Sequence, residues 1–119
     1  MRNALAERGV PYVYGGESRS GFDCSGLVRF VYGRIGISLP HYSGTQWEHG
    51  IPVPRWALKP GDLLFFRGLG HVAIYVGHGL MVHAPHTGTV VKVAPVSSNP
   101  GFDGAKRLLT LHNAARYTL

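Results

Sequence analysis

The stretch Gly21-Phe22-Asp23-Cys24-Ser25-Gly26-Leu27-Val28 places the only cysteine of the chain where a loop becomes a helix. Apolar residues follow Cys24 at offsets of 3, 4, 7 and 11, which lie on one face of a 3.6-residue period: Leu27, Val28, Val31 and Ile35. Asp23 is a favoured N-cap residue, because its carboxylate can accept hydrogen bonds from the free amides of a first helical turn. We therefore predict a helix from Cys24 to about Tyr32, ended by the glycines that follow.

Two interpretations of Cys24 follow from this placement. Free amides and the positive end of a helix dipole favour an anion, which would lower the pKa of the thiol and make it a stronger nucleophile. A lone cysteine can also be a small buried hydrophobic residue without chemical function. The neighbours Asp23, Ser25 and Gly26 are not typical core residues and favour the nucleophile. Exposure and thiol pKa are not readable from a sequence, so both interpretations stay open at this point.

Composition indicates one compact domain over residues 1–119, which we expect to be monomeric. Hydrophobic residues make up 45% of the chain, and its 17 glycines and 8 prolines are typical of a loop-rich globular fold. The net charge of +6 would attract an anionic polymer such as nucleic acid, an acidic membrane or a bacterial wall. The arginines are scattered and form no basic run with interleaved aromatic residues, which disfavours nucleic acid. No stretch has the length of a membrane span.

The order of elements predicts an α+β domain with N-terminal helices and a mainly antiparallel sheet. We expect helices at 3–8, 24–32 and 44–49, an irregular extended segment at 51–58, and a loop at 97–104. The expected strands are 63–66, 71–76, 80–84, 90–93 and 106–109.

Turn geometry selects two of the seven histidines. If residues 77–79 form a three-residue hairpin loop, Ala73 pairs with His83, and His71 becomes a diagonal neighbour of His83 on the same face. A two-residue loop would put the two histidines on opposite faces. A helix presenting Cys24 to that face would complete a nucleophile, a base and an orienting group.

The same three residues could instead bind zinc, which accepts one Cys and two His ligands. A fourth ligand or an open site would then be needed, and the chain has no second cysteine and no HxxxH pair to support it. We therefore place the zinc interpretation behind the nucleophile interpretation, and we expect neither metal nor cofactor.

Six motifs follow one another in a fixed order. They are 12–16 (Tyr-Val-Tyr-Gly-Gly), 22–28 (Phe-Asp-Cys-Ser-Gly-Leu-Val), 39–41 (Leu-Pro-His), 60–66 (Pro-Gly-Asp-Leu-Leu-Phe-Phe), 70–75 (Gly-His-Val-Ala-Ile-Tyr) and 81–84 (Met-Val-His-Ala). In this order they closely resemble the NlpC-type cell-wall cysteine peptidases, over about residues 3–110.

The resemblance implies a papain-like fold and cleavage of the peptide stems of bacterial peptidoglycan, commonly after a γ-linked D-glutamate. It implies Cys24 as the nucleophile, His71 as the base and His83 as the residue that orients the base. Tyr12 matches the tyrosine that lies near the nucleophile in this family; Tyr12, Asp23 and Ser25 are candidate substrate or oxyanion contacts. His41 stands where an arginine is frequent, so no substrate carboxylate contact is carried over to it. His86 lies past the matched motif and receives no role.

Two other hypotheses share these residues. An amidase or acyltransferase on the same fold would use the same nucleophile and base. A non-catalytic module that binds the cell wall would not need Cys24, His71 and His83 together. The start of the chain, at residues 1–6, lacks the apolar core of a signal peptide. We expect a domain from a longer secreted or phage protein, acting outside the cell or at the wall, with the export signal not in this chain.

Overall fold

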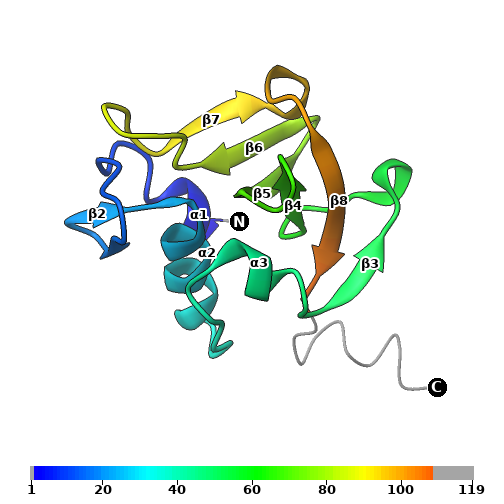
Figure 1. The fold of residues 1–119 in the computed structure, drawn as a ribbon, viewed down its shortest axis with the longest axis horizontal. Coiled ribbons are helices and arrows are strands. Elements are labelled where there is room, and N and C mark those ends of the chain that lie inside the picture. The colour runs from blue at the N-terminus through cyan, green and yellow to red at the C-terminus, as the bar shows by residue number, and fades with distance from the viewer. Residues whose placement is uncertain (1, 109–119) are drawn as a thin grey trace.

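The computed structural model describes residues 2–108, which form an α+β domain (Figure 1). The helices are α1 (Arg2–Leu5), α2 (Cys24–Gly33) and α3 (Ser43–Gln46), with 3-10 turns η1 (Arg55–Ala57) and η2 (Val96–Ser98). The strands are β1 (Glu17–Ser18), β2 (Gly21–Phe22), β3 (Ile51–Val53), β4 (Leu63–Phe66), β5 (His71–Gly77), β6 (Leu80–His83), β7 (Lys92–Pro95) and β8 (Phe102–Arg107). Leu109, the last residue of the predicted closing strand, and His112 lie outside the described residues.

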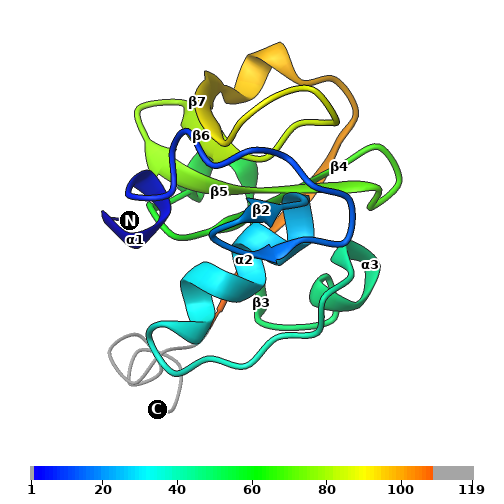
Figure 2. The same ribbon diagram turned by 90° about the vertical axis from the view of Figure 1, so that its left-hand side faces the viewer.

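The main sheet has six strands in the order β3-β8-β4-β5-β6-β7, and all neighbours are antiparallel. All four residues of β4 are buried, which explains its uninterrupted apolar run at the centre of the sheet. One face packs on α2, where Phe65, Val72 and Ile74 meet Leu27 and Val28. Figure 2 shows α2 lying against this face, with the short β1–β2 hairpin beside it.

The opposite face of the sheet holds a second, smaller core. Leu64, Phe66 and Ala73 pack there with Met81 and with Val96 from η2. Successive residues of β4 and β5 thus alternate between two cores, as the period of two residues in a strand requires. The papain-like α+β architecture predicted from the sequence is confirmed.

Helix α2 begins at Cys24, as its pattern predicts. The Asp23 carboxylate accepts the Gly26 N–H at 2.7 Å and caps the first turn. Leu27, Val28 and Val31 are buried. The prediction that Ile35 continues this face was wrong: Ile35 is half exposed, because α2 ends at Gly33.

The remaining boundaries differ from the sequence prediction where proline and glycine obscure the pattern. The extended segment contains a strand, β3, which pairs with β8 at the sheet edge, where the missing N–H of Pro52 is tolerated. Strand β8 begins at Phe102, so the predicted loop at 97–104 is instead η2 followed by strand. The predicted strand at 90–93 lies at 92–95, α1 ends at Leu5, and the β1–β2 hairpin was not predicted.

The β5–β6 hairpin has the expected register, but its loop differs from the predicted one. Ile74 pairs with Val82, which is the register that a three-residue loop would give. The loop itself has two residues, His78 and Gly79, with φ of 54° and 74°, as the favoured two-residue hairpin turn requires. A bulge between Tyr75 and Gly77 adds the extra residue. The three-residue loop was therefore wrong, but its consequence for the histidines holds.

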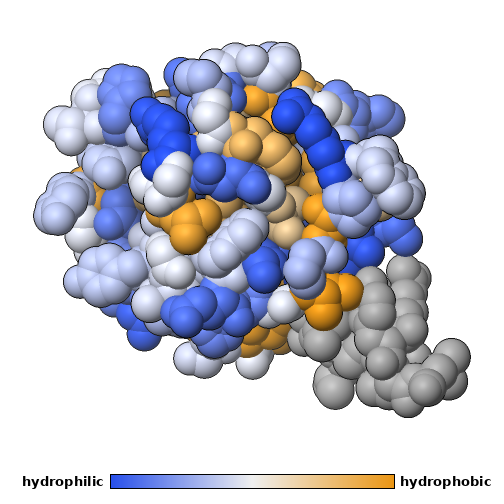
Figure 3. Space-filling view, turned by 45° about the vertical axis from the view of Figure 1, so that its right-hand side comes forward, coloured by the Kyte–Doolittle hydropathy of each residue, from blue (hydrophilic) through white to orange (hydrophobic). Residues whose placement is uncertain are grey.

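The face in Figure 3 carries hydrophilic side chains with small apolar areas between them, and no broad apolar surface is visible there. Among the described helices, none is long and apolar enough to cross a membrane.

Candidate active site

Cys24 lies at the first turn of α2, against the start of β5. Hydrogen bonding from the backbone of Val72, the residue after His71, acts on its thiol, together with that from Ser25 and from Cys24 itself. The thiol borders a surface pocket lined by Tyr12, Tyr14, Gly15, Asp23, Cys24, Ser25, His41, Tyr42, Ser43 and Gly70. The helix start thus presents its sulfur to the pocket and to the strand that carries His71.

Burial raises the pKa of the Cys24 thiol, and the neighbouring Asp23 carboxylate raises it further. The amides of Val72, Ser25 and Cys24 act in the opposite direction, but the desolvation of the thiolate is the larger effect. The sequence prediction of a lowered thiol pKa was therefore wrong. That prediction considered the amides of the helix start, but the burial of the thiol is not readable from the sequence.

His71 and His83 form a buried pair. Their side chains meet through His71 Nε2 and His83 Nδ1, which are 2.9 Å apart, and both residues are at least 95% buried. Burial lowers the pKa of His71 to about 3, with further lowering by His83 and Arg67. Burial also lowers the pKa of His83 to about 4, helped by Lys92, Arg67 and His86. Both rings are therefore neutral near pH 7, and one N–H is shared between them.

Asp23 is the centre of a hydrogen-bond network at the pocket rim. Besides Gly26, its Oδ1 contacts His41 Nε2 at 2.9 Å, and its Oδ2 accepts the Gly15 N–H at 3.1 Å. Ser25 is buried, and its hydroxyl lies 3.5 Å from Asp23 Oδ1. Asp23 therefore fixes both the start of α2 and the turn after Tyr12.

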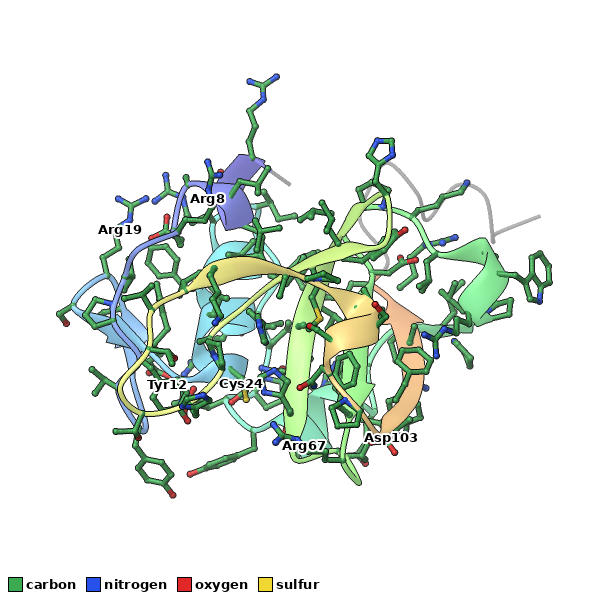
Figure 4. The ribbon with its side chains drawn as sticks, turned by 90° about the horizontal axis from the view of Figure 1, so that it is seen from above. Arg8, Tyr12, Arg19, Cys24, Arg67 and Asp103 are labelled. Atoms are coloured by element: carbon green, nitrogen blue, oxygen red, sulfur yellow. The ribbon has the colours of Figure 1, made fainter. Side chains whose placement is uncertain are left out.

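Tyr12 lies beside Cys24, as Figure 4 shows. Its backbone N–H donates to Thr89, and the turn that follows is tied to Asp23 through Gly15. Burial raises the pKa of the Tyr12 phenol, and the charges of Cys24 and Asp23 raise it further. The hydroxyl of Tyr12 is thus protonated near pH 7 and can donate a hydrogen bond.

The model of the NlpC/P60 family matches residues 9–104. The chain belongs to the NlpC/P60 family. It is 40% identical over 111 residues to the peptidoglycan endopeptidase RipA of Mycobacterium tuberculosis, with 81% of this chain and 24% of RipA covered. It is also 40% identical over 111 residues to the γ-D-glutamyl-L-lysine dipeptidyl-peptidase of Bacillus cereus, covering 85% of this chain and 33% of that protein.

Solved structures agree with this membership. The NlpC/P60 domain of the peptidoglycan hydrolase SagA superposes with a TM-score of 0.83 at 39% identity, covering 90% of this chain and 94% of that one. This NlpC/P60 domain therefore corresponds to a whole solved domain, whereas it spans about a quarter to a third of the two curated relatives above.

Sequence reasoning missed several residues that shape the site of this NlpC/P60 domain. Gln46 is fully buried, and its Nε2 donates to the Ser25 and Pro40 carbonyls, both at 2.9 Å, tying α3 to the first turn of α2. Arg67 stands near the histidine pair, on which its charge acts. His41 was placed in the 39–41 motif without a role, and the structure shows that it contacts two carboxylates. These residues follow no apolar period, so no periodic signal marks them. Within residues 2–108, no group of three or more His, Cys, Asp or Glu side chains is placed to hold a metal ion.

Proposed function

We propose that this NlpC/P60 domain is a cysteine peptidase that hydrolyses the peptide stems of bacterial peptidoglycan, with Cys24 as nucleophile, His71 as base and His83 as orienting residue. The observation that carries the proposal is a thiol at a helix start that borders a pocket and meets β5 at Val72. Val72 follows His71, which belongs to a buried pair of neutral histidines. The names of the relatives RipA and the dipeptidyl-peptidase support the same substrate class.

The charge states favour a general-base mechanism from a neutral thiol and a neutral imidazole. We assign the shared proton to His71 Nε2, which then donates to His83 Nδ1 and leaves His71 Nδ1 with a free lone pair. As the sulfur attacks the scissile carbonyl carbon, Nδ1 takes the thiol proton. A preformed thiolate is not required, which fits the raised pKa of Cys24.

The tetrahedral oxyanion needs hydrogen-bond donors at the pocket. The backbone N–H of Cys24 at the helix start supplies one, and the protonated hydroxyl of Tyr12 supplies the second. His71 then gives its proton to the leaving amine, and a thioester on Cys24 remains. Water attacks this thioester while His71 accepts its proton. As the C–S bond breaks, His71 returns that proton to the Cys24 sulfur, and the carboxylic acid and the free enzyme are released.

The bond we propose is that between a γ-linked D-glutamate and the following diamino acid. The relative from Bacillus cereus carries γ-D-glutamyl-L-lysine in its name, which supports this choice. We further propose that the domain acts as a monomer, outside the cell or at the wall, as part of a bacterial or phage protein. The pocket rim around Asp23 and Ser25 would then contact the stem, although both side chains already serve the network that fixes the helix start.

The test is a digest of purified peptidoglycan followed by mass spectrometry of the released muropeptides. The proposal expects a cut within the stem, with a new amino terminus on the diamino acid. A cut at the sugar–peptide bond would instead identify an amidase, and the absence of any product would favour a wall-binding module. Cys24→Ala serves as the matched control for contaminating hydrolases.

A further inference from the structure

His41 lies between two carboxylates at the rim of the Cys24 pocket. Its Nδ1 is 2.9 Å from Glu17 Oε2, and its Nε2 is 2.9 Å from Asp23 Oδ1. A neutral imidazole has one N–H, and its other nitrogen carries a lone pair. Both contacts are therefore hydrogen bonds only when the ring carries two protons. A neutral ring would turn one lone pair toward a carboxylate oxygen.

The two carboxylates belong to different parts of the site. Glu17 is in β1 of the short hairpin, and its Oε2 also accepts Arg29 Nη1 of α2 at 2.8 Å. Asp23 caps α2 and holds the turn after Tyr12. The doubly protonated ring thus joins the hairpin to the helix start. The side chains of His41 and Asp23 are 18% and 15% exposed, so solvent and salt screen their interaction less than that of a surface pair.

The charge of Asp23 acts on the nucleophile. The carboxylate is one cause of the raised pKa of Cys24. A cation held on Asp23 Oδ1 offsets that negative charge, whereas a neutral ring leaves it uncompensated beside the sulfur. The protonation of His41 therefore bears on the thiol without any contact between the two side chains.

We propose that His41, in its doubly protonated form, is a positioning residue that holds Asp23 to Glu17 and offsets the charge of Asp23 beside Cys24. Around His41 the titratable and charged groups are Glu17 from β1, Asp23 ahead of α2 and Arg29 from α2, with Tyr42 stacked on the ring at 5.5 Å. Tyr12, Tyr14 and Cys24 line the same pocket.

The expected effect on the thiol has a definite sign. While the ring carries two protons, the charge of Asp23 is compensated. A neutral side chain at position 41 loses one of the two contacts, and the charge of Asp23 then disfavours the thiolate. Cys24 then reacts more slowly than it would beside a permanent cation. Arginine supplies that cation, because its guanidinium stays protonated throughout.

The test is the rate of alkylation of Cys24 by iodoacetamide between pH 5 and 10, read from the intact mass, since the chain has one cysteine. The variants are His41→Arg and His41→Gln, with His49→Gln as a control at an exposed histidine. We expect the thiol of His41→Gln to titrate about one pH unit above that of His41→Arg. At the acid end of this range the parent chain should follow the arginine variant. His49→Gln should match the parent chain.

Coincident curves for the arginine and glutamine variants would overturn the proposal, as would a parent chain that follows the glutamine variant from pH 5 upward. If the arginine variant does not fold, Glu17→Gln decides, because it removes the negative charge that favours a proton on Nδ1 while it keeps an amide oxygen there. Its alkylation curve should shift from that of the parent chain toward that of His41→Gln, and a curve that matches the parent chain would contradict the proposal.

A second readout, the pH profile of kcat/KM on a soluble stem peptide, rests on the proposed function. The profiles of His41→Arg and His41→Gln should differ in the same sense as their alkylation curves, and coincident profiles would count against His41. If no stem peptide is cleaved, the proposed function fails, while the alkylation curves still decide the role of His41.

Discussion

Replacing His83 separates the orienting role of its ring from simple packing. The contact at issue is the 2.9 Å hydrogen bond between His71 Nε2 and His83 Nδ1, in which both residues are buried. His83→Ala removes the acceptor and leaves a buried N–H on His71. His83→Asn keeps an acceptor, because the amide oxygen takes nearly the place of Nδ1. It also removes Nε2, a buried nitrogen without a hydrogen-bond partner among the described residues.

The expected loss of activity in His83→Ala follows from the hydrogen-bond donor that is left unsatisfied. Leaving one buried polar group unpaired costs about 1–3 kcal/mol. If His71 must keep its tautomer and orientation to act as base, that cost enters the barrier as a loss of about 5- to 150-fold in kcat/KM. We expect His83→Ala to fall in this range and His83→Asn to stay within about tenfold of the parent chain.

The assay is kcat/KM on a soluble stem peptide, with thermal unfolding of each variant measured alongside. His78→Asn is the matched control, because His78 is exposed in the β5–β6 turn and its left-handed φ of 54° suits asparagine. Equal activity of the alanine and asparagine variants, at equal folded fractions, would refute the orienting role of His83.

Three further predictions follow from the structure. The parent thiol of Cys24 should titrate above the ordinary value of about 8.5 in alkylation, because burial disfavours the thiolate; a fast plateau at pH 5–6 would contradict this, since it requires a preformed thiolate. Gly26→Ala should lower Tm and abolish activity, because a methyl group there overlaps the Gly16 carbonyl oxygen. The control Gly33→Ala meets no atom within 4 Å and should leave both Tm and activity intact. Equal effects of the two variants would contradict the close contact between Gly26 and Gly16. The net charge of +6 should make cleavage of whole sacculi fall with salt more steeply than cleavage of a small stem peptide; parallel curves would remove this electrostatic role.

The sequence predicted those parts of the site that depend on local residue patterns. The cap at Asp23 and the apolar offsets after Cys24 specify α2 without reference to the rest of the chain. The His71–His83 contact followed from hairpin register alone, even though a bulge, and not a longer loop, supplies the extra residue. Register is a robust signal because a slip of one residue would move every side chain of the strand to the other face of the sheet and separate the two histidines.

The parts that were missed depend on segments that meet only in the folded chain. The Glu17–His41–Asp23 network joins a hairpin, a loop and a helix cap, and no periodicity links their positions. The thiol pKa was misjudged for a related reason. The sequence specifies that helix amides surround Cys24, but the burial that outweighs them comes from packing against β5.

Covalent trapping tests the central claim, that Cys24 is acylated by a peptidoglycan stem, most directly. The domain is mixed with a stem peptide, quenched in acid within its first turnovers, and measured by intact-protein mass spectrometry. We expect an added mass equal to the acyl part of the stem, carried on the peptide that contains Cys24, and neither adduct nor product with Cys24→Ala. Stem cleavage by Cys24→Ala would contradict the account, as would turnover by the parent chain with an acyl group on any other residue.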